Sequence, residues 1–443
     1  MSHKPTTHLK GDRGQAFTDR IRNIPPERIL CVSLDIGKYF HVVMIHNALG
    51  EIVTPTFEID IFQSGFTALC AAIDEASARR RAKVVLTGLE PTGHYFENLA
   101  RHLRARPQPV TLVNSYAVKQ NRSQQMMRRE KTDEIDVAAV GDLLRRGEGT
   151  AYRPASGPYL QLQQLDRTRI AKLKMQTMLK NQILGHLDRI FPGLVLQGEE
   201  ALDRYTPLFA TSFWQCQTLQ HLVRLCPDPC RLVTLSPSEL VALFHDHHYR
   251  LGRQNAAKII TYAQKTLLPD PELSTIRSDL LQADLTLLEH LQLQIDHLEQ
   301  RLGELLAPLP AAVWAKLKGL SAVQAASLAA AMGDPAHYTY AAQIFRRAGL
   351  VSGRNDSGNR QRKGKGQGVL KVGDVYLRRA LMTATETLIL HQPVLRTYYT
   401  TLKKTKHPGV ARVATARRAM GILWATLRDQ RSTLLILKKG ETM

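Results

Sequence analysis

Four acidic residues stand where their carboxylates could hold divalent metal ions: Asp35, Glu90, Asp133 and Asp136. Asp35 ends the apolar segment RILCVSLD and Glu90 ends KVVLTGLE, so each is expected at the end of a strand. Asp133 and Asp136 are three residues apart in KTDEIDVAAV, which places both on one face of an expected helix. Carboxylates that converge repel one another unless cations lie between them, and magnesium prefers oxygen ligands. We therefore predict a magnesium site, with two ions suited to phosphoryl transfer.

Each acid also has a purely structural interpretation, which the pattern alone leaves open. Thr132 can cap a helix whose first turn favours Asp133 and Asp136. Asp35 can be a turn residue, and Glu90 can be a surface acid. The Asp-Ile-Gly turn after the first strand also resembles the phosphate loop of sugar-kinase and actin-like ATPases, but no second Gly-rich phosphate loop accompanies it. Two acids at strand ends with a paired set downstream favour the metal site.

A second candidate site lies in the basic segment GLVSGRNDSGNRQRKGKGQGVLKVGDVYLRRAL. Its glycines let backbone amides approach phosphates, and its Arg and Lys side chains neutralise them. A serine here could attack phosphorus if a base or metal activated it, and Ser357 is better placed than Ser352. Both serines can also be ordinary loop residues. The cations expected to contact nucleic acid are Arg354, Arg360, Arg362, Lys363, Lys365, Lys371 and Arg378.

The charge of the whole chain indicates a polyanionic partner. In 443 residues, 60 Lys and Arg stand against 39 Asp and Glu, which gives a formal net charge of +21. This favours nucleic acid over an anionic membrane, because the cations are mixed with core-like segments and no apolar run approaches the roughly 20 residues of a membrane span. Five scattered cysteines and the absence of an apolar signal core indicate a cytoplasmic protein with reduced thiols rather than a zinc site.

The elements that must position the acids are predicted to form an α/β layer structure. Residues 29–46 read as a strand, a tight turn and a second strand, and EIVTPTFEI as a third. A helix over about 63–80, the strand ending in Glu90, a helix to about Leu103 and the strand PVTLVN follow. Three consecutive strands and then alternating helix and strand predict a mixed sheet in the order of the RNase H fold. In that fold the first and fourth strands are neighbours.

The rest of the chain is predicted to be mostly helical, with helices over about 158–200, 255–306 and 410–430. Within the second of these, six apolar residues follow the heptad spacing of a coiled coil: Leu288, Leu291, Ile295, Leu298, Leu302 and Leu305. A helix packed on its own domain fits the same spacing equally well. Downstream, KLKGLSAVQAASLAAAMGD reads as helix, glycine turn and helix, which could present amides to a DNA phosphate or serve packing alone.

From about residue 29 to 430 the sequence resembles the transposases of the insertion sequence one-ten type, which include the pilin-gene invertases. SLDIGK, LEPTGHY and KTDEIDVAAV resemble the family's Asp-Glu-Asp-Asp nuclease domain, which is similar to the RuvC resolvases. LKGLSAVQAASLAAAMGD, FRRAGLV, NDSGNR, VLKVGDVYLRRAL and KKTKHPGVARVATARRAMGILWATL resemble its transposase domain. Two departures concern the loops: the family's Gly-Ile-Gly is Gly319-Leu320-Ser321 here, and Asp356 replaces a serine that often precedes the nucleophile.

The resemblance implies a DNA recombinase that cuts and rejoins donor and target DNA under the guidance of a noncoding bridge RNA. It implies that Asp35, Glu90, Asp133 and Asp136 hold magnesium and that Ser357 forms a phosphoserine link to DNA. It also implies a homo-oligomer, dimer to tetramer, in which the metal site of one subunit meets the serine of another, with the heptad segment as a dimer contact. Such a protein acts in the prokaryotic cytoplasm at the nucleoid. A RuvC-like endonuclease without serine chemistry and a non-catalytic nucleic-acid-binding module are the alternatives.

Four parts are expected along the chain. They are a disordered basic N-terminus over 1–28, a RuvC-like DEDD nuclease domain over 29–155, a helical connector with a coiled coil over 156–310, and a mostly α C-terminal transposase domain over 311–443. The last part is expected to hold the helix-hairpin-helix-like segment and the catalytic serine.

Overall fold

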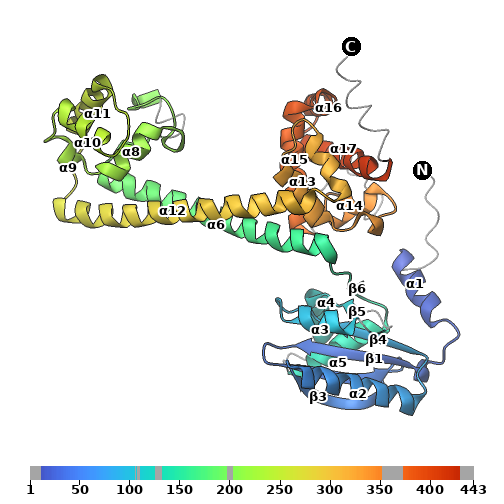
Figure 1. Cartoon of the computed structure of the whole chain (residues 1–443). Helices are drawn as coiled ribbons and strands as arrows, with labels where there is room; N and C mark the ends of the chain where they lie inside the picture. Colours follow the sequence, from blue (N-terminus) through green and yellow to red (C-terminus); the bar gives the residue numbers. More distant parts are fainter. Residues whose placement is uncertain are drawn as a thin grey trace. The chain divides into compact units, whose positions relative to one another are not determined.

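A computed structural model describes residues 11–104, 106, 110–124, 132–196, 203–351 and 373–429 of the chain. The chain divides into two compact units, Met1–Pro154 and Ala155–Met443. Figure 1 shows the elements of each unit. Within the described ranges, no helix combines the length and the apolar character that crossing a membrane requires.

A mixed sheet of six strands forms the centre of the first unit. Its strands are β1 (Ile29–Ile36), β2 (Phe40–Asn47), β3 (Ile52–Asp60), β4 (Val84–Leu89), β5 (Val110–Leu112) and β6 (Thr150–Ala151). They lie in the order β3-β2-β1-β4-β5-β6, in which β4 runs parallel to β1, β5 runs parallel to β4, and the other pairs are antiparallel. The predicted mixed sheet is therefore confirmed, and it is consistent with an RNase-H-like fold. The two-residue strand β6 has no counterpart among the expected strands, because so short a strand carries no periodic signal.

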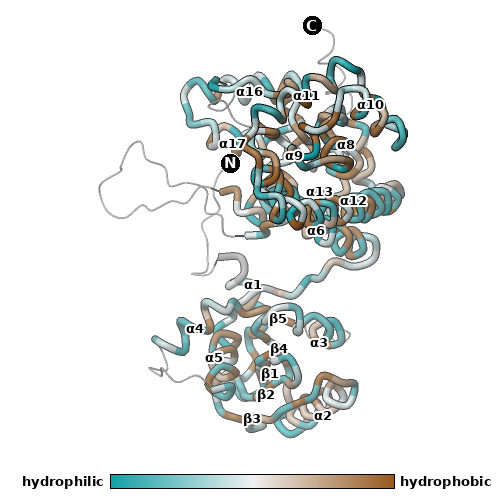
Figure 2. Tube along the Cα trace, turned by 90° about the vertical axis from the view of Figure 1, so that its left-hand side faces the viewer, coloured by the Kyte–Doolittle hydropathy of each residue, from teal (hydrophilic) through white to brown (hydrophobic). Residues whose placement is uncertain are grey.

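Helices cover both faces of this sheet (Figure 2). They are α2 (Gln63–Arg80), α3 (Phe96–Leu103), α4 (Ser115–Gln124) and α5 (Asp133–Arg145). On one face α2 and α3 share a core with Leu30, Val32 and Leu34 of β1. Because side chains alternate along a strand, Ser33 and Asp35 point to the opposite face, which α4 and α5 cover.

The segment before β1 is helical, which corrects one expectation. Residues 1–28 were expected to be disordered, but α1 (Gly11–Ile21) and the 3-10 turn η1 (Pro26–Arg28) form there. Phe17 and Ile21 lie four residues apart and pack against the α5 face of the sheet. This apolar pair is too short a pattern to stand out in a basic segment, and its burial in tertiary structure stabilises the helix.

Two long helices, α6 (Gly157–Ile190) and α12 (Pro271–Leu306), run antiparallel in the second unit (Figure 1). Arg169 of α6 donates from Nε to Oε1 of Glu299 on α12 at 2.7 Å. The predicted heptad residues of α12 bury their side chains within this chain, with Ile295 2% and Leu302 0% exposed. The helix therefore packs against α6 of its own chain, and the dimer contact expected from this segment stays a prediction.

Shorter helices pack near each end of this pair. Around one end lie η2 (Phe213–Gln215), α8 (Gln217–Leu225), α9 (Pro229–Leu232), α10 (Pro237–Asp246) and α11 (Arg253–Lys265). Around the other lie η3 (Pro310–Lys316), α13 (Ala322–Met332), η4 (Pro335–His337), α14 (Ala341–Arg347), α15 (Val375–His391), α16 (Pro393–Lys403) and α17 (Pro408–Asp429). Trp314 is fully buried in this second group, and its indole nitrogen donates to the carbonyl of Leu423 at 2.9 Å. Leu162 and Leu302 of the long helices belong to the same core.

Candidate functional site

The helix α5 approaches the acidic residue of β1 because a glycine lets it lie close to the sheet. Leu144, near the end of α5, packs with Cys31 at the start of β1. One turn earlier Gly141 lies over Ser33, where a Cβ atom would stand 2.7 Å from the serine Oγ. The start of α5 therefore lies toward Asp35, at the carboxyl edge of the sheet.

The four predicted acids come together at this edge. Asp35 stands next to the end of β1 and Glu90 directly follows β4, and the amide of Glu90 donates to the carbonyl of Leu34 at 3.4 Å. The pKa of Asp35 is raised to about 6, mainly by burial and in addition by the negative charges of Asp136, Glu90 and Asp133. Asp136, Glu90 and Asp133 thus lie near enough for their negative charges to act on Asp35.

The chemistry of this donor set fits a hard divalent cation, although the side chains do not stand in ligand positions. In the described part of the chain, no three or more His, Cys, Asp or Glu side chains are grouped closely enough to hold a metal ion. Asp136, which is 5% exposed, instead pairs with the guanidinium of Arg122 on α4. Carboxylate oxygens are the ligands that magnesium prefers, and their mutual repulsion is the cost that a cation would relieve. Among the contacts of the described residues, the ion pair between Arg122 and Asp136 is the only one that brings a positive charge to any of the four acids.

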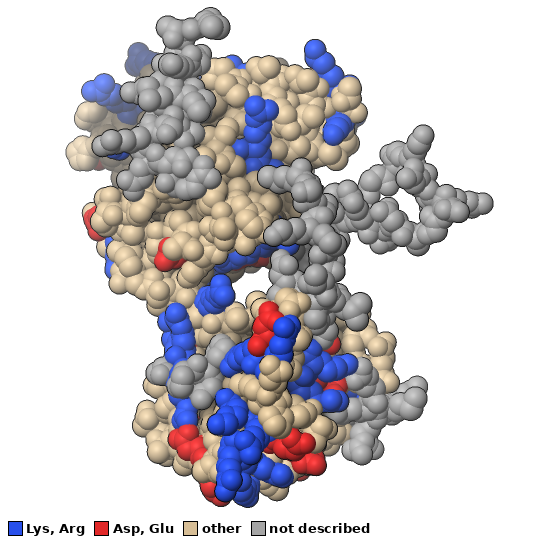
Figure 3. All heavy atoms as spheres, turned by 90° about the vertical axis from the view of Figure 1, so that its right-hand side faces the viewer, with Lys and Arg blue, Asp and Glu red and all other residues tan. Residues whose placement is uncertain are grey.

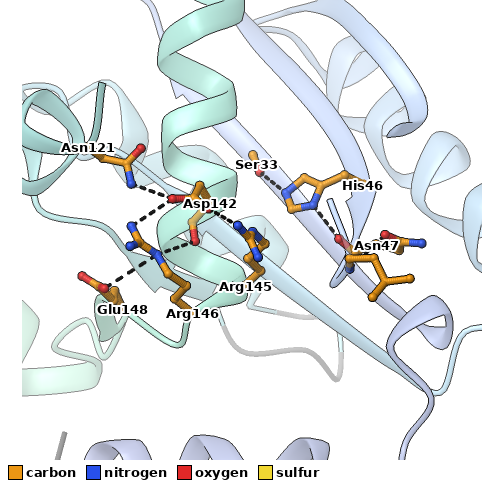
Figure 4. A network of polar contacts seen from close by, with 9 residues as sticks. Ser33, His46, Asn47, Asn121, Asp142, Arg145, Arg146 and Glu148 are labelled. Carbon is orange, nitrogen blue, oxygen red and sulfur yellow. Dashed lines mark hydrogen bonds and ion pairs between the residues drawn. The ribbon is translucent and has the colours of Figure 1, made fainter. Parts of the chain in front are cut away.

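A polar network fixes the other end of α5 (Figure 4). The carboxylate of Asp142 accepts a hydrogen bond from Nδ2 of Asn121 at 2.6 Å and pairs with Arg145 and, at 2.9 Å, with Arg146. Burial by itself would raise the pKa of Asp142, but the hydrogen bond and the two positive charges outweigh it and hold the pKa below its usual value. Because Asn121 belongs to α4, this contact ties α4 to α5 and positions the neighbouring Arg122.

Lys and Arg side chains gather on one face of the first unit (Figure 3). Independently of that view, Lys83 and Arg28 of the first unit lie at the amino edge of the sheet, opposite the acids: the amide of Lys83 donates to the carbonyl of Arg28 at 2.8 Å, just before β4 and β1 begin. At the same edge, Arg80 ends α2 and stands 3.9 Å from Glu51, which precedes β3. The sequence did not single out this cationic edge, because its residues come from separate segments.

The second candidate site falls largely outside the described residues. Ser352, Ser357 and six of the seven cations predicted to contact nucleic acid lie there: Arg354, Arg360, Arg362, Lys363, Lys365 and Lys371. Arg378 is described, and its guanidinium donates to the carbonyl of Ala348 at 3.0 Å, which is a contact within the fold.

The glycine turn before α13 packs against the domain. Gly319 has a φ of +99°, and a Cβ atom there would lie 2.8 Å from that of His391. At the start of α13, the Ser321 hydroxyl accepts from the amide of Gln324, whose side chain accepts from the amide of Ser321. Both amides therefore already donate hydrogen bonds within the protein. This favours the interpretation that the segment serves packing over the interpretation that it presents amides to a phosphate.

Two family models match the chain. Residues 32–192 match a model described as a transposase, of the DEDD type of IS110 elements, and this match includes all four acids. Residues 311–400 match a model described as a transposase of the IS116/IS110/IS902 family. No curated protein shows significant similarity to the chain.

Proposed function

The chain belongs to the IS116/IS110/IS902 family of transposases, and from this premise we propose that it recombines DNA by combining a magnesium-bound acidic site with a serine nucleophile, guided by a bridge RNA. DNA is the substrate class of a transposase. The observation that carries the proposal is that Asp136, Glu90 and Asp133 lie near enough to Asp35 at the carboxyl edge of the sheet for their charges, after burial, to raise its pKa.

Asp35, Glu90, Asp133 and Asp136 are proposed to hold the magnesium ions. When bound, such ions would supply positive charge to the scissile phosphate and to the oxygens that attack and leave it. The protein's own contribution is to hold acids from three segments at one edge, with α5 fixed by Gly141 and Asp142. In the absence of a cation, Arg122 neutralises Asp136 and limits the repulsion within the cluster.

Ser357 is proposed as the nucleophile. Its Oγ would form a bond to phosphorus as its proton passes to a base, while the bond from phosphorus to a deoxyribose oxygen breaks and that oxygen leaves. The phosphoserine link would conserve the phosphoester bond for rejoining to a second DNA end. This proposal is supported by the family match over 311–400, which includes the serine.

The nucleic-acid partners are proposed to be donor DNA, target DNA and a bridge RNA, with a homo-oligomer, dimer to tetramer, that brings the metal site of one subunit to the serine of another. The formal net charge of +21 supports a large polyanionic partner. The cationic edge around Arg28, Lys83 and Arg80 supports a second contact with a phosphate backbone, away from the acids.

Recombination of donor and target DNA in the presence of the RNA tests the proposal. Ser357→Ala should abolish strand exchange and the covalent protein–DNA adduct seen under denaturing conditions, while RNA binding remains. Asp35→Asn should abolish DNA cutting, whereas Glu75→Gln, an exposed acid on α2, should not. Normal strand exchange by Ser357→Ala would exclude the serine. Hydrolysed ends without any adduct would indicate a metal-dependent endonuclease, and no magnesium-dependent cutting would indicate a binding module.

A further inference from the structure

A pocket of about 510 Å³ opens at the carboxyl edge of the sheet. Its walls come from the turn after β1, the start of α2 and the segment that leads from Glu90 into α3. Lys38 follows Asp35 by three residues and His94 follows Glu90 by four, so the pocket walls continue the strands that carry two of the acids. His41, which lines the pocket, lies on the same face of β2 as the core residues Val43 and Ile45, the face that α2 and α3 cover, whereas α5 covers the other face. The pocket and the acids therefore flank the same strand ends.

Exposed aromatic rings stand at this pocket. Tyr39 is 68% exposed and Phe62 is 71% exposed, although both are large apolar groups. The ammonium group of Lys38 lies 4.8 Å from the centre of the Tyr39 ring, and the rings of His94 and Tyr95 are 4.4 Å apart between centres. Aromatic faces next to cations are the combination with which proteins stack the bases and hold the backbone of unpaired nucleic acid strands.

Polar side chains also line the pocket beside these rings. The amide side chains of Gln63 and Asn98 line the same pocket and can both donate and accept. Nucleobase edges present donors and acceptors of this kind beside a flat apolar face.

We propose that this pocket holds an unstacked nucleobase of the DNA strand whose phosphate lies at the acidic cluster. The placement of that phosphate rests on the proposed function, whereas the base site itself rests on the pocket. Tyr39 and Phe62 provide the stacking surface, and the exposed amides of Gln63 and Asn98 provide hydrogen bonds to the base edge. Removing a base from its stack and holding it here restrains the adjacent phosphate, as enzymes do when they need access to a site within a strand.

Binding to single strands in EDTA tests this inference without any cleavage. The full chain is titrated with two fluorescent oligonucleotides of equal length, one of mixed sequence and one with abasic sugars on the same backbone. We expect tighter binding of the strand with bases, by roughly tenfold, since a stacked base commonly contributes that much. The double variant Tyr39→Ala/Phe62→Ala should lose most of this preference. Leu49→Ala, a control at the turn between β2 and β3 that is 52% exposed, should keep it.

Equal affinity of the unmodified chain for the two strands would overturn the inference, as would an unchanged preference in the double variant. Photo-crosslinking of the unmodified chain to a 5-iodouracil strand provides a measurement that does not depend on how the variant folds. Crosslinks at Tyr39, Phe62 or Tyr95 would support the pocket, and crosslinks elsewhere alone would exclude it. A protein that is inactive in recombination can still bind the strand with bases more tightly than the abasic strand in EDTA, and an active protein can bind the two equally. The two proposals therefore succeed or fail separately.

Discussion

Replacing Asp35 by Asn should stabilise the metal-free protein at neutral pH, because it removes a negative charge that is partly buried and lies near three other acids. In the folded chain the pKa of Asp35 is raised from 3.8 to about 6, first by burial and then by Asp136, Glu90 and Asp133. A carboxyl that holds its proton more tightly when folded makes stability fall as pH rises between these two values. Above this window the ionised side chain costs the folded state at most about 3 kcal/mol, because one pKa unit corresponds to about 1.4 kcal/mol and solvent screens part of the charge on this incompletely buried group.

Urea unfolding of the full chain in EDTA, followed from about pH 4 to about pH 8, measures this cost. Asp35→Asn should be more stable than the unmodified protein by up to about 3 kcal/mol at the high end, and the difference should shrink toward the low end. In magnesium the unmodified protein should become the more stable of the two. A ligand that binds only the folded state stabilises it more the more tightly it binds, and the variant should bind magnesium more weakly. Glu75→Gln, an exposed acid on α2, is the control and should behave like the unmodified protein.

Equal stability of the two proteins at the high end of the pH range would refute the reasoning, because an ionised carboxylate that is partly buried near three other acids must cost the folded state free energy. A stability difference that stays constant with pH would refute it as well, since it would have to come from packing rather than from ionisation. Loss of recombination by Asp35→Asn without either stability effect would leave the residue important but would contradict the electrostatic account of the cluster.

Three further changes test how the acids are positioned. Arg122→Gln leaves the buried carboxylate of Asp136 without its counter-ion, so urea unfolding in EDTA should show a loss of about 2–4 kcal/mol that magnesium partly restores; no loss would contradict the pairing. Gly141→Ala places a Cβ atom 2.3 Å from Nε2 of His46, which should cost about 1–3 kcal/mol and lower cutting activity by shifting α5, and full activity would argue against that packing. Asp142→Asn should destabilise the protein at neutral pH. Because the pKa of Asp142 is lowered by folding, that effect should vanish as pH falls through the folded pKa, and a pH-independent loss would contradict the ionic network.

Much of the candidate site follows from local patterns in the sequence. An apolar, β-branched segment that stops at an acid predicts a strand whose last side chain stands at the edge of a sheet, and both Asp35 and Glu90 lie there. Thr132 accepts a hydrogen bond from the amide of Ile135, and α5 begins at Asp133 as the capping signal predicts. These features depend on neighbours within a few residues, which is why one sequence suffices to predict them.

Contacts between distant segments were decided by the tertiary structure alone. Arg122 meets Asp136 because α4 and α5 are tied together, and the heptad seam of α12 meets α6 of the same chain. The pocket that Tyr39 and Phe62 line is built from several segments. A heptad spacing specifies that an apolar stripe will be covered but not which helix covers it. The order of the apolar segments along the sequence was sufficient to predict the mixed sheet and the acidic residues at its edge. The charges and cavities around those acids depend on contacts between segments that are far apart in the chain. Such contacts leave no periodic pattern in the sequence from which they could be predicted.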